Sequence, residues 1–175
     1  MEGIKMVNKQ EYITSWLKEY AEEYKFKGFV IGVSGGIDSA VTSTLCALTG
    51  METTVLLLPI HQAQDQTVRG HNHIQWLIRK FPNVTWQTIA LSKTFDELSW
   101  VLPKDVTPLA LANSKARIRM TALYAVAQSY NLLVAGTGNK VEDYGIGFFT
   151  KYGDGGVDLS PIGDLTKTQV WQMGR

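Results

Sequence analysis

A short segment rich in glycine and serine carries the clearest chemistry in this sequence. It reads Gly32-Val-Ser-Gly-Gly-Ile-Asp-Ser39 and follows an apolar run. Glycines let a backbone approach an anion closely, serine hydroxyls supply donors, and the start of a following helix adds unpaired N–H groups. The segment therefore predicts a phosphate-binding loop, whose members are Gly32, Val33, Ser34, Gly35, Gly36, Ile37 and Ser39.

The carboxylate of Asp38 indicates that a cation takes part in this loop. A carboxylate repels phosphate unless a cation lies between them, and Mg²⁺ binds carboxylate and phosphate oxygens together. The loop lacks both the Gly-Lys-Ser/Thr ending of a Walker A loop and the G-x-G-x-x-G fingerprint, so it disfavours kinase-type and standard dehydrogenase sites. The alternative interpretation is a plain glycine turn between a strand and a helix.

Alternating strand-like and helix-like segments must position this loop. Buried strands are predicted at residues 28–33, 53–59, 84–91 and 132–135. Helices are predicted at residues 8–24, with Asn8 and Glu11 as a capping box, and at 40–48, 65–81, 109–130 and from 166 onward. This order predicts an α/β fold with an open parallel sheet and helices on both faces. Ligands of such sheets bind at the carboxyl ends of the strands, where the glycine-rich loop is expected.

A second glycine-rich segment extends from Thr137 to Asp158. It contains six of the 16 glycines of the chain and has no clean hydrophobic period. Long segments without regular structure are uncommon in compact domains and are usually functional. The segment follows the predicted strand at 132–135, so its first residues are expected at the same sheet edge as the first loop.

The composition restricts the function further. The 175 residues are 45% hydrophobic and 19% charged, which excludes a disordered chain, and a net charge of +1 disfavours a nucleic-acid binder. No apolar run approaches the ~20 residues that cross a bilayer, and the charged N-terminus does not resemble a secretory signal. The lone Cys46 is expected in the core rather than as a nucleophile. These features predict a cytoplasmic protein that binds neither nucleic acid nor membranes.

Ser34-Gly-Gly-Ile-Asp-Ser39 resembles the pyrophosphate loop of the N-type ATP pyrophosphatases. Enzymes of that superfamily cleave ATP to AMP and pyrophosphate and adenylate an acceptor. The resemblance implies a Rossmann-like fold of the adenine nucleotide alpha hydrolase type, with ATP bound at this loop. The loop alone does not choose among the members, which include NAD, GMP and asparagine synthetases.

Three later segments resemble the ammonia-dependent NAD synthetases. They are Asn113-Ser-Lys-Ala-Arg-Ile-Arg-Met120, Gly136-Thr-Gly-Asn-Lys-Val-Glu-Asp143, and the stretch from Thr150-Lys-Tyr-Gly-Asp-Gly-Gly to Lys167-Thr168. The resemblance assigns Thr137 and Lys167 to ATP, and Glu142 to Mg²⁺ together with Asp38. It assigns the deamido-NAD substrate to Arg117, Lys151 and Asp158. Arg119 is left open between a substrate contact and a structural role.

The implied reaction is the ATP-dependent amidation of deamido-NAD with ammonia. It yields NAD, AMP and pyrophosphate through an acyl-adenylate, with Asp38, Glu142 and Lys167 as the catalytic residues. Because the chain has no room for a glutaminase domain, the nitrogen source is expected to be ammonia. The resemblance also implies a homodimer.

Two alternatives remain open at this point. Members of this family continue beyond the length of this chain, so we expect residues 1–175 to form one domain that is incomplete after Arg175. The chain could then be a truncated nucleotide-binding module without activity. It could also be another adenylating enzyme of the superfamily with a different acceptor.

Overall fold

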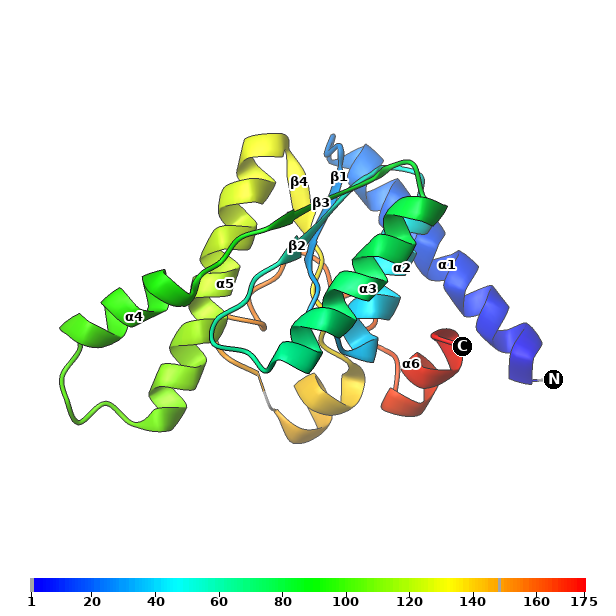
Figure 1. Cartoon of the computed structure of the whole chain (residues 1–175). Helices are drawn as coiled ribbons and strands as arrows, with labels where there is room; N and C mark the ends of the chain where they lie inside the picture. Colours follow the sequence, from blue (N-terminus) through cyan, green and yellow to red (C-terminus); the bar gives the residue numbers. More distant parts are fainter. Residues whose placement is uncertain (1, 148) are drawn as a thin grey trace.

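Four parallel strands form the centre of the computed structural model of the chain, which describes residues 2–147 and 149–175 (Figure 1). The strands are β1 (Gly28–Gly32), β2 (Glu52–Leu57), β3 (Val84–Thr88) and β4 (Leu132–Val134). Their order in the sheet is β3-β2-β1-β4. All three pairings are parallel, so the four carboxyl ends lie at one edge.

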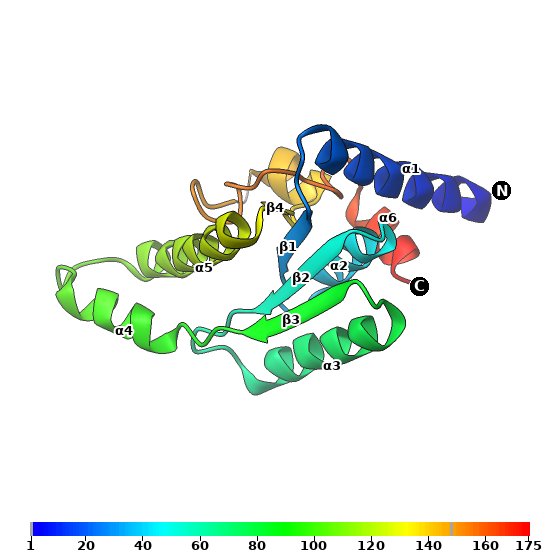
Figure 2. The same ribbon diagram turned by 90° about the horizontal axis from the view of Figure 1, so that it is seen from above.

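Helices cover both faces of this sheet, as the sequence predicted (Figure 2). One face carries α1 (Glu2–Glu23), α2 (Ile37–Leu48), α3 (Gln64–Lys80) and α6 (Lys167–Met173). The other face carries α4 (Ser92–Val101) and α5 (Pro108–Tyr130). A π-helix, η1 (Val141–Ile146), interrupts the segment between β4 and α6. None of the helices in the described residues combines the length and apolarity needed to cross a membrane.

Strand β1 shows why its sequence is an uninterrupted apolar run. Phe29 and Ile31 pack into the core cluster shared with α1 and α2, whereas Val30 packs into the cluster shared with α5. All three side chains are fully buried. A strand that is covered on both faces cannot alternate polar and apolar residues, because both sets of side chains face the core.

The ends of α5 are fixed by local chemistry. The hydroxyl of Thr107 accepts a hydrogen bond from the backbone N–H of Ala110 at 3.2 Å, and Pro108 follows at the first helical position. At the other end Asn131 adopts the left-handed conformation with φ 59°, and its side chain donates to the carbonyl of Lys25 at 2.8 Å. These contacts turn the chain from α5 directly into β4.

Two helices differ from the sequence prediction. Helix α1 begins at Glu2 rather than at Asn8, because the preceding residues contain no proline and the helix includes Gly3 and continues through the Asn–Glu pair. Helix α4 was not predicted. Only Phe95 of α4 is buried, while Trp100 and Val101 are exposed, so its sequence lacks the apolar stripe that marks an amphipathic helix.

Strand β3 is shorter than predicted because it forms the edge of the sheet. Only Val84 of its five residues is buried. The backbone nevertheless keeps pairing beyond the strand: the N–H of Ile89 donates to Leu57 and that of Leu91 donates to Pro59. The apolar residues that extended the prediction to Leu91 therefore belong to a paired connection that leads into α4.

The pairing of β1 with β2 yields a stability prediction. A Cβ added at Gly28 would lie 1.8 Å from the backbone oxygen of Glu52 in β2, which cannot move without opening the sheet. We expect Gly28→Ala to lower the free energy of unfolding by about 3 kcal/mol or more. Urea unfolding followed by circular dichroism measures this change.

Gly32→Ala is the matched control in the same strand. Its added Cβ would meet Leu123 and Leu58 no closer than 3.6 Å, which is ordinary contact. We expect this variant to unfold within about 1 kcal/mol of the wild type. Equal losses for both variants would contradict the register of β1 and β2.

Candidate functional site

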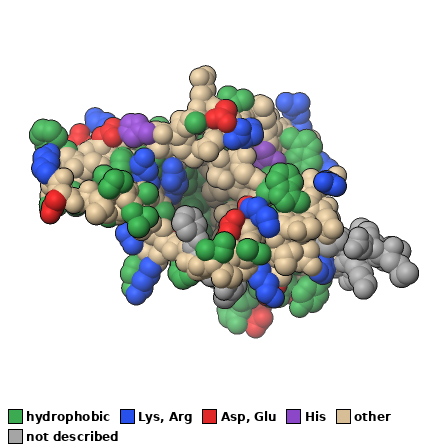
Figure 3. Space-filling view, turned by 90° about the horizontal axis from the view of Figure 1, so that it is seen from below, with side chains coloured by type: hydrophobic (Ala, Val, Ile, Leu, Met, Phe, Trp, Pro, Cys, Tyr) green, Lys and Arg blue, Asp and Glu red, His purple; other side chains and the backbone are tan. Residues whose placement is uncertain are grey.

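The loops after β1 and β4 meet at the carboxyl edge of the sheet. The connection from β1 to β2 passes through α2 on one face, while the connection from β3 to β4 passes through α5 on the other. The chain therefore leaves a crevice between β1 and β4, the position where ligands bind in open α/β sheets. Figure 3 views the molecule from this edge, which is hollowed near its centre, with acidic and basic side chains around the hollow.

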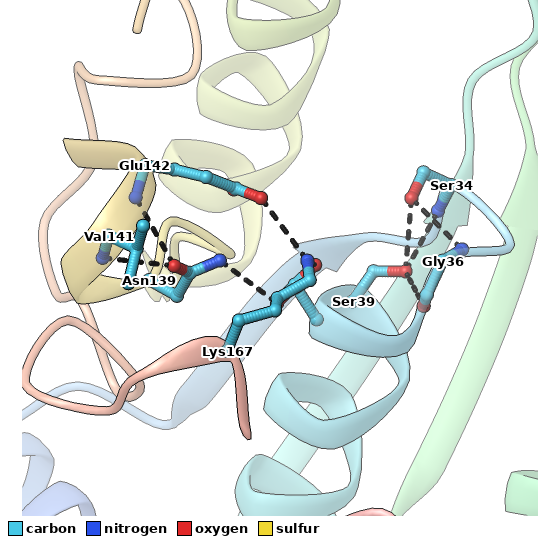
Figure 4. Close-up of polar contacts among 8 residues, drawn as sticks. Ser34, Gly36, Ser39, Asn139, Val141, Glu142 and Lys167 are labelled. Carbon is cyan, nitrogen blue, oxygen red and sulfur yellow. Dashed lines mark hydrogen bonds and ion pairs between the residues drawn. The ribbon is translucent and has the colours of Figure 1, made fainter. Parts of the chain in front are cut away.

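The loop after β1 is shaped by its own hydroxyl groups (Figure 4). The Oγ of Ser39 accepts from the N–H of Ser34 at 3.2 Å and donates to the carbonyl of Gly36 at 3.0 Å. The Oγ of Ser34 accepts from the N–H of Gly36 at 3.3 Å. These bonds hold the predicted phosphate loop in one compact turn at the start of α2.

The N-terminus of α2 has no side-chain cap. Gly36 is its N-cap residue and has no side chain that could accept from the first-turn N–H groups. Gly35 adopts φ +84°, and an added Cβ there would lie 2.4 Å from the backbone oxygen of Gln66 in α3. The loop therefore requires glycine, and the uncapped helix end offers N–H donors and a partial positive charge to an anion.

Three charged side chains from distant parts of the chain meet beside this loop (Figure 4). The ammonium of Lys167 donates to Oδ2 of Asp38 at 2.5 Å and to Oε1 of Glu142 at 3.1 Å. Asp38 is mostly buried, with a side-chain exposure of 17%, whereas the other two are about 40% exposed. The three residues predicted to be catalytic are thus in direct contact.

The two carboxylates keep Lys167 charged. Partial burial lowers the pKa of its ammonium, but the hydrogen bonds to Asp38 and Glu142 outweigh this effect and raise the pKa above its ordinary value. The side chain starts from a fixed point, because Thr166 and Gln169 form a reciprocal capping box at the start of α6. The capping box therefore fixes the backbone from which the Lys167 side chain projects.

Asn139 is a site residue that the sequence reasoning missed. Its side chain is completely buried, and its Nδ2 donates to Oδ1 of Asp38 at 3.2 Å. Its Oδ1 accepts from the N–H groups of Val141 and Glu142 at 3.1 and 3.2 Å. The available signal was the spacing: an Asn three residues before Glu142 is typical of a side chain that caps a following turn.

The donor set fits a magnesium ion that is shared with a phosphate ligand. Among the side chains that the structure describes, which do not include that of Asp143, no cluster of three or more His, Cys, Asp or Glu residues is placed to hold a metal. Asp38 and Glu142 supply a pair of carboxylates that face one another across a single ammonium nitrogen. Mg²⁺ is commonly held by one or two carboxylates plus substrate phosphates and water, so this pair suffices only if a phosphate completes the site.

A cavity of about 280 Å³ opens beside the loop between β1, β4 and α5. The predicted residues Gly32, Val33, Ser34 and Thr137 line it. Its apolar wall includes side chains from the strand ends, from α5 and from the segment between η1 and α6, among them Leu58, Met120, Leu123, Val134 and Val157. A mainly apolar cavity with a few polar groups, next to an anion-binding loop, suits a flat heterocycle attached to phosphates.

Three polar side chains complete the lining of the cavity: Gln62, Arg119 and Asp154. Gln62 and Asp154 were not predicted, since neither lies in a motif that was assigned a ligand. Arg119 was left open, and the structure shows a structural contact for it at the cavity wall. Its Nε donates to the carbonyl of Leu58 at 2.9 Å, which anchors the guanidinium in the cavity wall.

The three residues predicted for the second substrate lie apart from the charged cluster. Arg117 and Lys151 are exposed, and the Nε of Arg117 donates to the backbone carbonyl of Lys151 at 3.1 Å. The carboxylate of Asp158 accepts from the N–H of Val134 at 2.8 Å and from the hydroxyl of Tyr124 at 2.9 Å. Burial, reinforced by this carboxylate, raises the pKa of Tyr124 to about 12. Asp158 therefore binds the edge of β4 that is not paired with β1.

Solved structures share the fold of this chain. The chain superimposes on the structure of NMN synthetase from Francisella tularensis with a TM-score of 0.89 and 37% sequence identity, covering 97% of this chain and 69% of that one. Such agreement confirms the Rossmann-like parallel sheet with helices on both faces.

Comparison with similar sequences indicates one family. The chain is 39% identical over 173 residues to the NH₃-dependent NAD⁺ synthetase of Carboxydothermus hydrogenoformans, covering 95% of this chain and 68% of the relative. It is 41% identical over 164 residues to that of Sulfurisphaera tokodaii, covering 94% of this chain and 57% of the relative. The chain thus spans little more than half of some relatives. Since the family model for NAD synthase also matches residues 9–175, the chain belongs to the NAD synthase family.

Proposed function

We propose that the chain contributes the ATP-binding site for the amidation of deamido-NAD with ammonia, a reaction that yields NAD, AMP and pyrophosphate. One observation carries this proposal: Lys167 bridges Asp38 and Glu142 beside the uncapped start of α2. Two carboxylates and a mobile cation next to a phosphate loop suit the departure of pyrophosphate, where negative charge grows on the leaving group.

The site has two regions, one for the triphosphate of ATP and one for its adenosine. The triphosphate would lie against the N–H groups and hydroxyls of residues 34–39, and the adenosine would occupy the cavity beside Thr137. Arg119 and Gln62 line that cavity and would select the base or ribose by hydrogen bonds. The α-phosphate would then lie where the loop and the cavity meet, at Ser34.

Asp38 and Glu142 would hold Mg²⁺ together with the phosphate oxygens. When bound, the ion would neutralise charge on the triphosphate and on the departing pyrophosphate. The ammonium of Lys167 lies between these carboxylates in the structure. Because its side chain is 40% exposed and flexible, it can turn from the carboxylates to the phosphates when a ligand enters.

The chemistry needs no nucleophile from the protein. A carboxylate oxygen on the nicotinic ring attacks the α-phosphorus, the bond to the bridging oxygen breaks, and its electron pair leaves with pyrophosphate. Ammonia then attacks the carbonyl carbon of the acyl-adenylate, and AMP departs as one proton is released. The residues position the reactants and balance their charge.

The exposed cations suit the second substrate. Arg117 and Lys151 lie side by side at the surface and would contact the diphosphate of a dinucleotide. Asp158 lies at the edge of β4 and would contact the same substrate through its remaining acceptor capacity. Because these residues are exposed, a second copy of the chain would enclose the substrate, which supports a homodimer. A cytoplasmic location fits the single, buried cysteine.

A second candidate acceptor is nicotinic acid mononucleotide. The similar structure from Francisella tularensis is described as an NMN synthetase, which favours a mononucleotide as the species that is amidated. The ATP site would serve either acceptor, since both present the same ring carboxylate. The acceptors differ in whether a second nucleotide extends toward the exposed cations Arg117 and Lys151.

The first functional prediction concerns the products of the reaction. With Mg-ATP, deamido-NAD and ammonium, we expect NAD, AMP and pyrophosphate in equal amounts, quantified together by chromatography. We expect the mononucleotide to be amidated more slowly, because it lacks the part that reaches Arg117 and Lys151. Formation of ADP and phosphate would contradict attack at the α-phosphorus. A lack of turnover combined with ATP binding would support a nucleotide-binding module without activity.

The second prediction concerns the carboxylates. Asp38→Asn and Glu142→Gln keep the side-chain shapes but remove the charges that would hold the metal. We expect each to lower the turnover number by about 100-fold or more, with little change in the unfolding midpoint. Asp105→Asn, an exposed residue before α5, is the control and should retain full activity. An active double variant of the two carboxylates would exclude them as metal ligands.

The third prediction concerns Lys167 as a cation that competes with the metal. Lys167→Met removes an ammonium that contacts both carboxylates. In the absence of nucleotide, we expect the variant to bind Mn²⁺ on the order of tenfold more tightly than the wild type. The reason is that the substitution removes a positive charge that repels the metal ion. Turnover should fall in the same variant, since the phosphates lose a cation. Titration calorimetry measures the affinity, and an unchanged or weaker Mn²⁺ affinity would show that Lys167 does not occupy the metal position.

A further inference from the structure

Asn139 and the residue after it connect three segments that carry the charged groups of the site. The side chain of Asn139 contacts Asp38 at the start of α2 and the first N–H groups of η1, which carries Glu142. The N–H of the next residue, Lys140, donates to the carbonyl of Leu165 at 3.0 Å, just before α6 and Lys167. Asn139 therefore joins the segments of the two carboxylates directly, and the backbone of Lys140 adds the segment of Lys167.

The orientation of the Asn139 amide follows from its neighbours. The N–H groups of Val141 and Glu142 need an acceptor, which only the amide oxygen supplies. The carboxylate of Asp38 needs a donor, which only the amide nitrogen supplies. A short, uncharged side chain with both functions is what this point in the structure requires. An aspartate would lack the donor, and it would add a second negative charge beside Asp38.

The hydrogen bonds divide the two oxygens of Asp38 between two partners. Oδ1 accepts from Asn139, whereas Oδ2 accepts from Lys167. If Lys167 turns toward a ligand, Oδ2 becomes free while Oδ1 stays held. The backbone of Glu142 also stays held, because its N–H remains bonded to the same amide.

We propose that Asn139 is a positioning residue that fixes Asp38 and Glu142 relative to each other when Lys167 leaves them. It contacts neither phosphate nor metal itself, and it acts through the two carboxylates. Its complete burial keeps water from replacing either set of hydrogen bonds. The inference rests on the proposed function in one respect, which is that the carboxylate pair receives a divalent cation together with ATP.

The test compares Asn139→Ser with Asn139→Ala. The serine adds no charge and its hydroxyl keeps an acceptor for the N–H groups of η1, but its shorter side chain loses the donation to Asp38, while the alanine loses both. The probe is Mn²⁺ titrated in the presence of an ATP analogue with a methylene group between the α- and β-phosphorus atoms, which cannot be cleaved there. We expect the affinity for Mn²⁺ to fall on the order of tenfold in both variants.

Asn83→Ala provides the matched control. Asn83 also makes two hydrogen bonds through its amide, to the carbonyls of Ala47 and Met51, but it lies at the opposite end of the sheet. We expect this variant to lose stability without any change in the Mn²⁺ affinity. In active protein, raising Mg²⁺ should recover part of the turnover of Asn139→Ala and none of the small loss in Asn83→Ala.

The outcomes separate this inference from the proposed function. Normal Mn²⁺ affinity in folded Asn139 variants would overturn the positioning role, even if the wild type makes NAD. Weakened Mn²⁺ affinity in these variants, with the control unchanged, would support the role even if the wild type makes none. If Asn139→Ala does not fold, Asn139→Ser decides the question, because it keeps an acceptor for the N–H groups of its own segment and adds no charge.

Discussion

The parallel pairing of β1 with β4 is the constraint on which the site depends. It places Gly28 opposite Leu132 and Val30 opposite Val134, so two chain segments about a hundred residues apart end at the same edge. Helices α2 and α5 must then lie on opposite faces, and no connection crosses the crevice between the two strand ends. The phosphate loop, the cavity and the charged cluster all follow from this crevice.

The charges at this edge are balanced in an unusual way. Asp38 and Glu142 face each other, and such a pair would repel without a cation between them. Lys167 supplies that cation from a helix whose start is fixed by a capping box. The ammonium therefore offsets part of the charge of the two carboxylates. In the proposed function, Mg²⁺ would replace Lys167 between them, so the carboxylates would keep a counter-charge.

The sequence predicted the sheet, and it predicted that Asp38 and Glu142 lie at one edge of it, for a definite physical reason. Buried strands leave continuous apolar runs, as in 28–33, and motif residues at strand ends must meet at one edge. What it did not predict depends on tertiary contacts. Helix α4 has a single buried residue, Phe95, and so no period. Asn139 is an ordinary turn residue in the sequence, and only the fold reveals that its amide faces Asp38.

The position of the cysteine shows what kind of catalysis this fold can support. Cys46 is completely buried in α2, and its burial raises the pKa of the thiol far above the usual range, so the sulfur stays protonated and inaccessible. Asp38, by contrast, lies at the first turn of the same helix, where it is held by Asn139 and Lys167. Helix α2 thus carries an unreactive, buried cysteine in the core and a charged, hydrogen-bonded aspartate at its N-terminal end. In the proposed reaction, this end of the helix contributes orientation and electrostatics, and the substrates supply the nucleophiles.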